Sequence, residues 1–176
     1  MREKLNQDLK DCGAVQFGRF VLTSGAVSDY YIDIKNASTN LDTLRKITEE
    51  FSEYVSGYDI LAGMELGAVP LVVALALETN VPYVIIRKKK REHGTGKQIE
   101  GGSVKGKRAL IIEDVTTSGG STVKGVEFLR EAGAVVDKAL VVVDRESGAK
   151  EKLKELDVEL YPLLSVSEIL KDRKKS

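Results

Sequence analysis

Residues 109–122, ALIIEDVTTSGGST, decide the fold that the sequence predicts. The stretch begins with four consecutive apolar residues, which are typical of a buried β-strand. Two carboxylates, Glu113 and Asp114, come next, followed by a run of glycines and hydroxyl-bearing residues. Apolar residues then recur with helical spacing from Val123 to Leu129. A strand, a tight turn and a helix in this order place the turn at the carboxyl edge of an open α/β sheet, where ligands of such sheets bind.

The turn has the composition of a phosphate-binding loop. Glycine lets backbone amides approach an anion, successive amides form a concave nest, and the following helix directs its positive end to the same point. Glu113 and Asp114 would repel a phosphate, but carboxylates accept hydrogen bonds from sugar hydroxyls and can hold a hydrated metal ion. A sugar phosphate therefore suits both parts. The alternative is an ordinary turn that caps a helix, and the stretch contains neither a Walker loop nor a GxGxxG motif.

Length, composition and charge favour one compact domain. The chain has 176 residues, which is enough for a substantial core. Its 27 basic and 27 acidic residues cancel, so no overall field attracts nucleic acid. Cys12 is the only cysteine, which excludes an internal disulfide and a thiolate metal cluster. No uncharged apolar run approaches about 20 residues, and the polar N-terminus does not resemble a secretory signal. We therefore expect a cytoplasmic protein that binds neither nucleic acid nor a membrane.

Hydrophobic patterns predict an α/β fold with a mainly parallel five-stranded sheet flanked by helices. Strand, helix and strand over residues 58–86 form a right-handed crossover. Because the helix that starts at Pro70 is apolar nearly all round, we expect it to be buried. The five predicted strands cover residues 58–64, 81–86, 109–112, 138–143 and 158–164. The other predicted helices cover residues 2–11, 41–55 with Asn40 as a cap, the segment between the central loop and Gly133, 149–156 and 166–170.

The two ends of the chain are predicted to differ from this core. Residues 17–22 and 30–34 have the pattern of two short strands separated by turn residues. Two such strands cannot bury themselves, so they must fold over a larger body. The last six residues, KDRKKS, are expected to be disordered.

Residues 87–106, RKKKREHGTGKQIEGGSVKG, form a basic and glycine-rich stretch between two predicted strands. Its first five residues are cations, and His93 is the only histidine in the chain. Long loops without secondary structure in a compact domain are often lids. The stretch leaves a strand at the same edge as Glu113 and Asp114, and its charge complements a diphosphate. The alternative is a solvated, charged turn with an incidental histidine.

The central stretch resembles the phosphoribosyl-diphosphate (PRPP) signature of type I phosphoribosyltransferases. Three other segments resemble orotate phosphoribosyltransferases in particular. Residues 20–33 resemble the segment that forms a hood over the base, and residues 87–94 resemble the lid motif R-K-x-x-K-x-H-G, with Arg91 in place of lysine. Residues 144–148, DRESG, resemble the D-R-x-x-G segment that binds orotate. Two positions depart from the bacterial pattern: Thr23 replaces a lysine, and Glu65-Leu66 replaces Tyr-Lys in a second loop that contacts diphosphate.

The resemblance implies roles for individual residues. Arg91 and His93 are the expected catalytic residues, on a lid that reaches into the partner's site of a homodimer. Thr117 and Arg145 are expected to bind orotate, and Arg145 discriminates orotate from purines. Mg2+ is the implied cofactor, held mainly through PRPP without a direct protein ligand. The residues implied to bind PRPP are Arg87, Lys88, Arg91, His93, Glu113, Asp114, Val115, Thr116, Thr117, Ser118, Gly119, Gly120 and Ser121.

The resemblance extends over nearly the whole chain and implies a single domain over residues 1–176, with a hood at 1–40 and a mobile lid at 87–103. The implied reaction transfers the 5-phosphoribosyl group from PRPP to orotate, giving orotidine 5-phosphate and diphosphate in pyrimidine biosynthesis. We expect no side-chain nucleophile. Two alternatives stay open: a purine or uracil phosphoribosyltransferase, and a non-catalytic regulator that senses PRPP.

Overall fold

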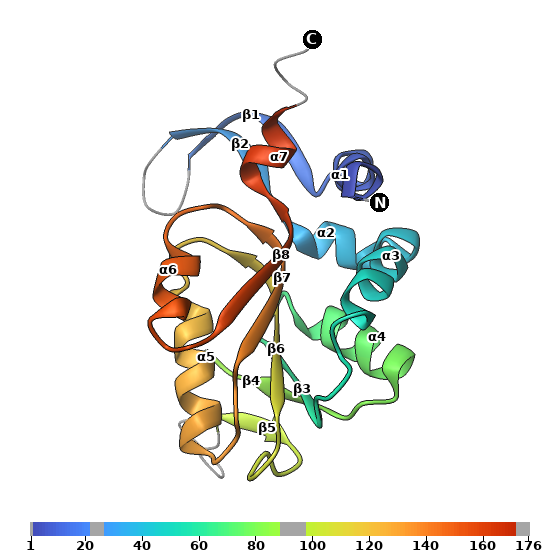
Figure 1. Cartoon of the computed structure of the whole chain (residues 1–176). Coiled ribbons are helices and arrows are strands. Elements are labelled where there is room, and N and C mark those ends of the chain that lie inside the picture. Colours follow the sequence, from blue (N-terminus) through green and yellow to red (C-terminus); the bar gives the residue numbers. More distant parts are fainter. Residues whose placement is uncertain (1, 22–26, 89–97, 172–176) are drawn as a thin grey trace.

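The computed structural model describes residues 2–21, 27–88 and 98–171 (Figure 1). Within these ranges the elements, in chain order, are α1 (Arg2–Asp11), β1 (Val15–Val21), β2 (Val27–Ile32), α2 (Ile34–Thr39), α3 (Leu41–Ser52), β3 (Ile60–Met64), α4 (Val69–Thr79), β4 (Tyr83–Ile86), β5 (Ile99–Gly101), β6 (Ala109–Thr116), α5 (Gly120–Glu131), β7 (Lys138–Asp144), α6 (Ala149–Lys154), β8 (Glu159–Ser165) and α7 (Val166–Lys171). None of the helices in these ranges combines the length and the apolar character that crossing a membrane requires.

The main sheet confirms the predicted fold class and adds one strand to it. Its order is β5-β4-β3-β6-β7-β8. The five strands β4, β3, β6, β7 and β8 run parallel to one another. The sixth strand, β5, pairs antiparallel with β4, with Ile86 opposite Ile99. β5 was not predicted, because a three-residue strand that ends in the first of two glycines is too short a pattern to indicate a strand. By pairing with β4, β5 supplies hydrogen-bond partners to backbone groups of β4 that would otherwise lie at the edge of the sheet.

Both faces of the sheet are buried, which explains why its strands are almost continuously apolar. Leu61, Leu110 and Leu140 belong to the core on the side of α3 and α4. Their neighbours Ile60 and Ile111 belong to a second core, on the side of α5 and α6. Figure 1 shows these two helix layers on opposite sides of the sheet. Because helices cover both faces of the sheet, a ligand site is expected at the ends of its strands.

The prediction that α4 is buried is wrong for its outer side. Leu71, Val72 and Leu75 are fully buried against the sheet and α3. Leu77, however, is 82% exposed, and Leu66, just before the helix, is 70% exposed. An apolar helix can lie on the surface of a layer, and its composition does not reveal how many of its sides are covered. Apolar side chains are therefore exposed just before α4 and near its C-terminal end.

The N-terminal hairpin is present and lies at the top of the molecule in Figure 1. β1 and β2 pair antiparallel, with Val15 opposite Ile32. The second strand ends two residues earlier than predicted, because Asp33 caps α2 by accepting a hydrogen bond from the amide of Lys35 at 3.0 Å. Thr23, which lies between β1 and β2 in the sequence, and the C-terminal residues 172–176 lie outside the described residues.

Three helix boundaries in the core lie within one residue of their predicted positions. Asn40 caps α3, and its side chain accepts a hydrogen bond from the amide of Thr43 at 3.1 Å. Pro70 lies in the first turn of α4, where its missing amide proton is not needed. Gly133 follows α5 with a φ of +87°, a conformation that favours glycine and ends the helix.

Candidate active site

The two carboxylates of the central stretch lie within β6, not beyond its end. The strand runs to Thr116, four residues further than predicted, because it continues to pair with β7 as far as Asp144. Side chains of a strand alternate between faces, so the two acids have different surroundings. Glu113 is 4% exposed, whereas Asp114 is partly exposed. The pair therefore consists of one buried and one accessible carboxyl group.

Glu113 is held by the loop that it precedes. Its Oε2 accepts a hydrogen bond from the Ser121 hydroxyl at 3.2 Å, at the start of α5. Burial is the main reason why the pKa of Glu113 is raised to about 8, and its contact with the Asp114 carboxyl group raises it further. The folded protein therefore favours the protonated form of Glu113 near neutral pH.

Asp114 leans over the turn that follows β3. A Cβ atom added at Gly67 would lie 1.8 Å from Oδ2 of Asp114, so only glycine leaves room for this carboxylate. The close approach joins the ends of β3 and β6 into one site. Gly67 was not predicted as a site residue, because the sequence around a turn glycine does not indicate which strand packs against it.

The loop from Thr117 to Ser121 has the features of an anion site. Gly119 has a φ of +75° and packs against Ala149, so it is both conformationally and sterically required. It stands at the N-cap of α5, where a glycine has no side chain with which to cap the helix. Thr117, Ser118 and Gly120 are exposed. The first amides of α5 and the exposed hydroxyls can therefore donate to a phosphate.

Arg145 lies beside this loop, on the neighbouring strand end. Its amide donates to the carbonyl of Thr116 at 2.9 Å, which continues the pairing of β6 and β7. Its guanidinium lies 5.3 Å from the centre of the Tyr30 ring, and Nη2 donates to the Tyr30 hydroxyl at 3.4 Å. The hairpin therefore contacts the residue that the sequence predicts to bind orotate.

Arg145 is not the partner of the two acids that flank it in the sequence. Asp144 accepts a hydrogen bond from the amide of Glu146 at 2.9 Å. Glu146 in turn accepts from the amide of Ser167 at 3.0 Å and from the Ser167 hydroxyl. Because both carboxylates have these partners, the Arg145 guanidinium can bind a planar anion with its remaining donors.

The start of the predicted lid lies close to the loop. A cavity of about 310 Å³ is lined by Arg87 and Lys88 and by Gly120, Ser121 and Lys124 of α5, together with Met64 and Phe128. The structure thus brings four of the predicted PRPP residues to one cavity. Arg91 and His93 lie outside the described residues.

Two predicted PRPP residues offer little side chain to a ligand. Thr116 is 1% exposed, and Val115 is partly buried against the core next to α3 and α4. We therefore expect their backbone groups to make most of any contact with a ligand.

The sequence indicated no role for Glu65, although it departs from the bacterial pattern. Its side chain accepts a hydrogen bond from the amide of Lys88.

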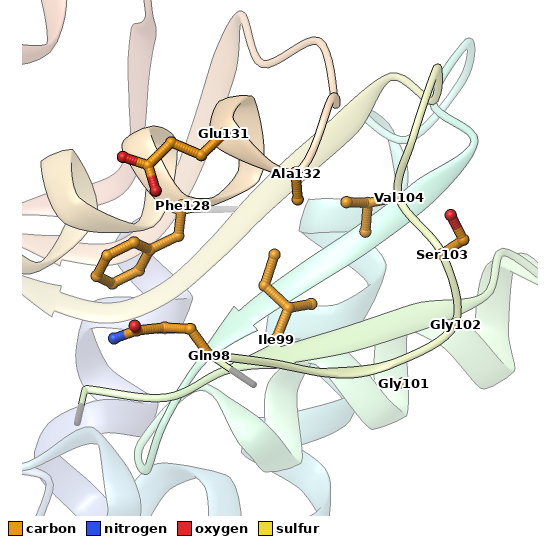
Figure 2. Close-up of a pocket in the computed structure, with 9 residues that line it drawn as sticks. All are labelled: Gln98, Ile99, Gly101, Gly102, Ser103, Val104, Phe128, Glu131 and Ala132. Carbon is orange, nitrogen blue, oxygen red and sulfur yellow. The ribbon is translucent and has the colours of Figure 1, made fainter. Parts of the chain in front are cut away.

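A larger hollow, of about 570 Å³, lies at the other end of α5 (Figure 2). Its wall includes Ile99 and Gly101 of β5 and Glu131 at the end of α5. It contains none of the carboxylates or loop residues described above, and its size alone does not indicate a site. The residues with matched chemistry are those at the carboxyl edge of the sheet.

Comparison with known proteins agrees with this geometry. Residues 33–160 match the model of the phosphoribosyl transferase domain family. A curated protein of Pyrococcus horikoshii named orotate phosphoribosyltransferase is 51% identical over 175 residues, which cover 97% of this chain and 94% of that protein. This chain belongs to the orotate phosphoribosyltransferase family.

Solved structures of orotate phosphoribosyltransferases have the same fold. The crystal structure of the enzyme from Aeropyrum pernix is 34% identical, with a TM-score of 0.88, and the match covers 98% of this chain and 99% of that one. The enzyme from Mycobacterium tuberculosis, crystallised with PRPP, is 26% identical with a TM-score of 0.78, and the match covers 96% and 98% of the two chains.

Proposed function

We propose that this chain transfers the 5-phosphoribosyl group of PRPP to orotate, giving orotidine 5-phosphate and diphosphate. The observation that carries the proposal is the arrangement at the ends of β6 and β7. Two carboxylates, an uncapped helix start and Arg145 converge there, on a fold whose relatives bear the name of this activity.

In this proposal each part of the edge binds one part of the substrates. Glu113 and Asp114 accept hydrogen bonds from the ribose hydroxyls, and the 116–121 loop with the first amides of α5 holds the 5-phosphate. Thr117 and Arg145 bind orotate, whose carboxylate suits the fork of a guanidinium. Two observations support this assignment. Thr117 is exposed, and Tyr30 of the hood lies against the guanidinium of Arg145, beside the proposed orotate position.

The leaving diphosphate is the part that needs positive charge. Breaking the bond to the ribose leaves positive charge on the sugar, as in glycoside hydrolysis, so stabilising the leaving group lowers the barrier. We assign this role to Arg87, Lys88, Arg91 and His93, with the last two as catalytic residues. The cavity that Arg87 and Lys88 share with Ser121 supports the assignment for the first two.

Mg2+ fits the donors of this edge. It is proposed to be held mainly by oxygen atoms of PRPP, and the partly exposed carboxylate of Asp114 can bind one of its waters. When bound, the ion neutralises developing charge on the diphosphate.

The lid is proposed to act in the partner's site of a homodimer. The exposed apolar side chains of Leu66 and Leu77 are available to such an interface. Within the single domain over 1–176, residues 1–40 are proposed as the hood and residues 87–103 as the mobile lid. Residues 99–101 of this range belong to β5 and pair with β4, so the proposed movement is confined to the residues before β5. A cytoplasmic location stays a prediction from the sequence.

Release of diphosphate from PRPP tests the function directly. The full chain is assayed with orotate, uracil, adenine and hypoxanthine, each with and without Mg2+. We expect release with orotate and Mg2+ and less than about one hundredth of that rate with the other bases. Release with a purine or with uracil instead would identify the other transferase class, and PRPP binding without any release would indicate a sensor.

A further inference from the structure

Glu65 lies in the turn after β3, and its carboxylate contacts the residues that begin the lid. Oε1 accepts a hydrogen bond from the amide of Lys88 at 2.6 Å, and Oε2 lies 4.0 Å from Nε of Arg87. The backbone amide of Glu65 also donates to the carbonyl of Ile86 at 2.9 Å. The turn and the end of β4 are therefore joined through both main chain and side chain.

Arg87 is held between two carboxylates. On the side away from Glu65, its Nη1 donates to Oε1 of Glu100 at 3.4 Å, and β5 carries Glu100. Nε of Arg87 is buried and has no hydrogen-bond partner among the residues that the structure describes. The guanidinium is thus oriented by two carboxylates, and the remaining N–H groups of its two Nη atoms are the donors for another anion.

The same two residues line the 310 Å³ cavity together with Gly120 and Ser121 at the start of α5. The residues that Glu65 contacts therefore lie next to the loop proposed to hold the sugar phosphate. A diphosphate that binds Arg87 must share it with the carboxylate of Glu65, and the two anions repel one another. Glu65 is 30% exposed in its side chain, so solvent weakens this repulsion without removing it.

We propose that Glu65 is a positioning residue of the diphosphate site. It holds the amide of Lys88 and the guanidinium of Arg87 in place before PRPP binds. Its negative charge also weakens the grip of these groups on diphosphate, which favours release of the product. This inference rests on the proposed function, because it assigns a role to Glu65 within the same site.

Two substitutions separate the two effects of Glu65. Glu65→Gln keeps an oxygen that accepts from the Lys88 amide but removes the charge, so the Kd for inorganic diphosphate with Mg2+ should fall about 3-fold. Glu65→Ala removes the acceptor as well, so kcat/KM for PRPP should fall roughly 10-fold, and Glu65→Gln should restore it to within about 2-fold of wild type. Glu100→Gln is the matched control, because it takes a carboxylate from Arg87 and leaves the Lys88 contact intact.

The measurements are calorimetric titration of the full chain with magnesium diphosphate, steady-state kinetics with PRPP, and melting temperatures. The control should change kcat/KM for PRPP by less than about 2-fold, because Arg87 and Glu100 form a long, partly exposed ion pair that solvent screens. A wild-type kcat/KM in Glu65→Ala, or weaker diphosphate binding in Glu65→Gln, overturns the inference. If Glu65→Ala does not fold, the diphosphate Kd of Glu65→Gln decides alone. Wild-type protein without orotate-dependent release of diphosphate contradicts the proposed function instead.

Discussion

Replacing Glu113 with glutamine should make the protein more stable at alkaline pH while weakening its proposed site for ribose. The fold raises the pKa of this carboxyl from 4.5 to about 8, so the native state binds its proton more tightly than the unfolded chain does. Stability that depends on this proton is complete below pH 4.5 and is lost as pH rises towards 8. Glutamine carries no charge at any of these pH values, so the variant avoids the loss.

The size of the effect follows from the pKa difference. Each pKa unit corresponds to about 1.4 kcal/mol, so the interval from 4.5 to about 8 sets an upper limit on the order of 5 kcal/mol for the stability that wild type loses. Rearrangement of the loop around an ionised Glu113 lowers this figure, and we expect a relative gain of at least about 2 kcal/mol for Glu113→Gln between pH 5 and pH 9. The variant can still accept a hydrogen bond from Ser121.

Urea denaturation of both proteins at several pH values measures the difference in the free energy of unfolding. Comparing the two proteins at each pH cancels the titration of all other groups. Glu159→Gln is a suitable control, because this carboxylate is 64% exposed and pairs with Lys138 at 3.1 Å. Its effect should stay within about 1 kcal/mol at every pH. A stability difference between Glu113→Gln and wild type that does not change from pH 5 to pH 9 would refute the reasoning.

Three further substitutions test separate parts of the site. Gly67→Ala places a Cβ 1.8 Å from Oδ2 of Asp114 and should displace this carboxylate. KM for PRPP should therefore rise by about 10-fold or more, while the melting temperature falls by only a few degrees. An unchanged KM would show that Asp114 does not hold PRPP. Tyr30→Leu removes the ring and the hydroxyl that contact Arg145, so KM for orotate should rise about 5-fold while KM for PRPP stays unchanged. Tyr30→Phe keeps the cation–π contact and should recover most of the loss. Equal effects on both substrates would contradict this. Arg91→Ala should lower kcat by roughly 100-fold if Arg91 stabilises the departing diphosphate, and normal turnover would reject its catalytic role.

The sequence was sufficient for those features that depend on short-range patterns. The central strand, the loop and the helix that follows were predicted because apolar runs, glycines and helical spacing all lie within 109–129. The cap at Asn40 and the glycine after α5 were predicted for the same reason, since both are set by a few adjacent residues. The order of the motifs along the chain then indicated the family.

Features that depend on contacts between distant segments were not predicted. Gly67 becomes essential only because Asp114 lies against it, 47 positions later in the sequence. The contact of Tyr30 with Arg145 joins segments 115 residues apart. The strand β5 exists because β4 offers it an edge, and the exposure of Leu77 depends on what lies outside the helix layer. None of these has a signature in its local sequence.

The hydrogen bond from the Arg145 amide to the Thr116 carbonyl has an evolutionary consequence. It makes the residue proposed to select the base a direct neighbour of the groups proposed to bind the sugar. On this proposal, base preference can diverge largely through changes just after β7 and in the hood that contacts Arg145, while the residues proposed to bind PRPP stay the same. A lineage could exchange one nucleobase for another at this boundary without rebuilding its scaffold.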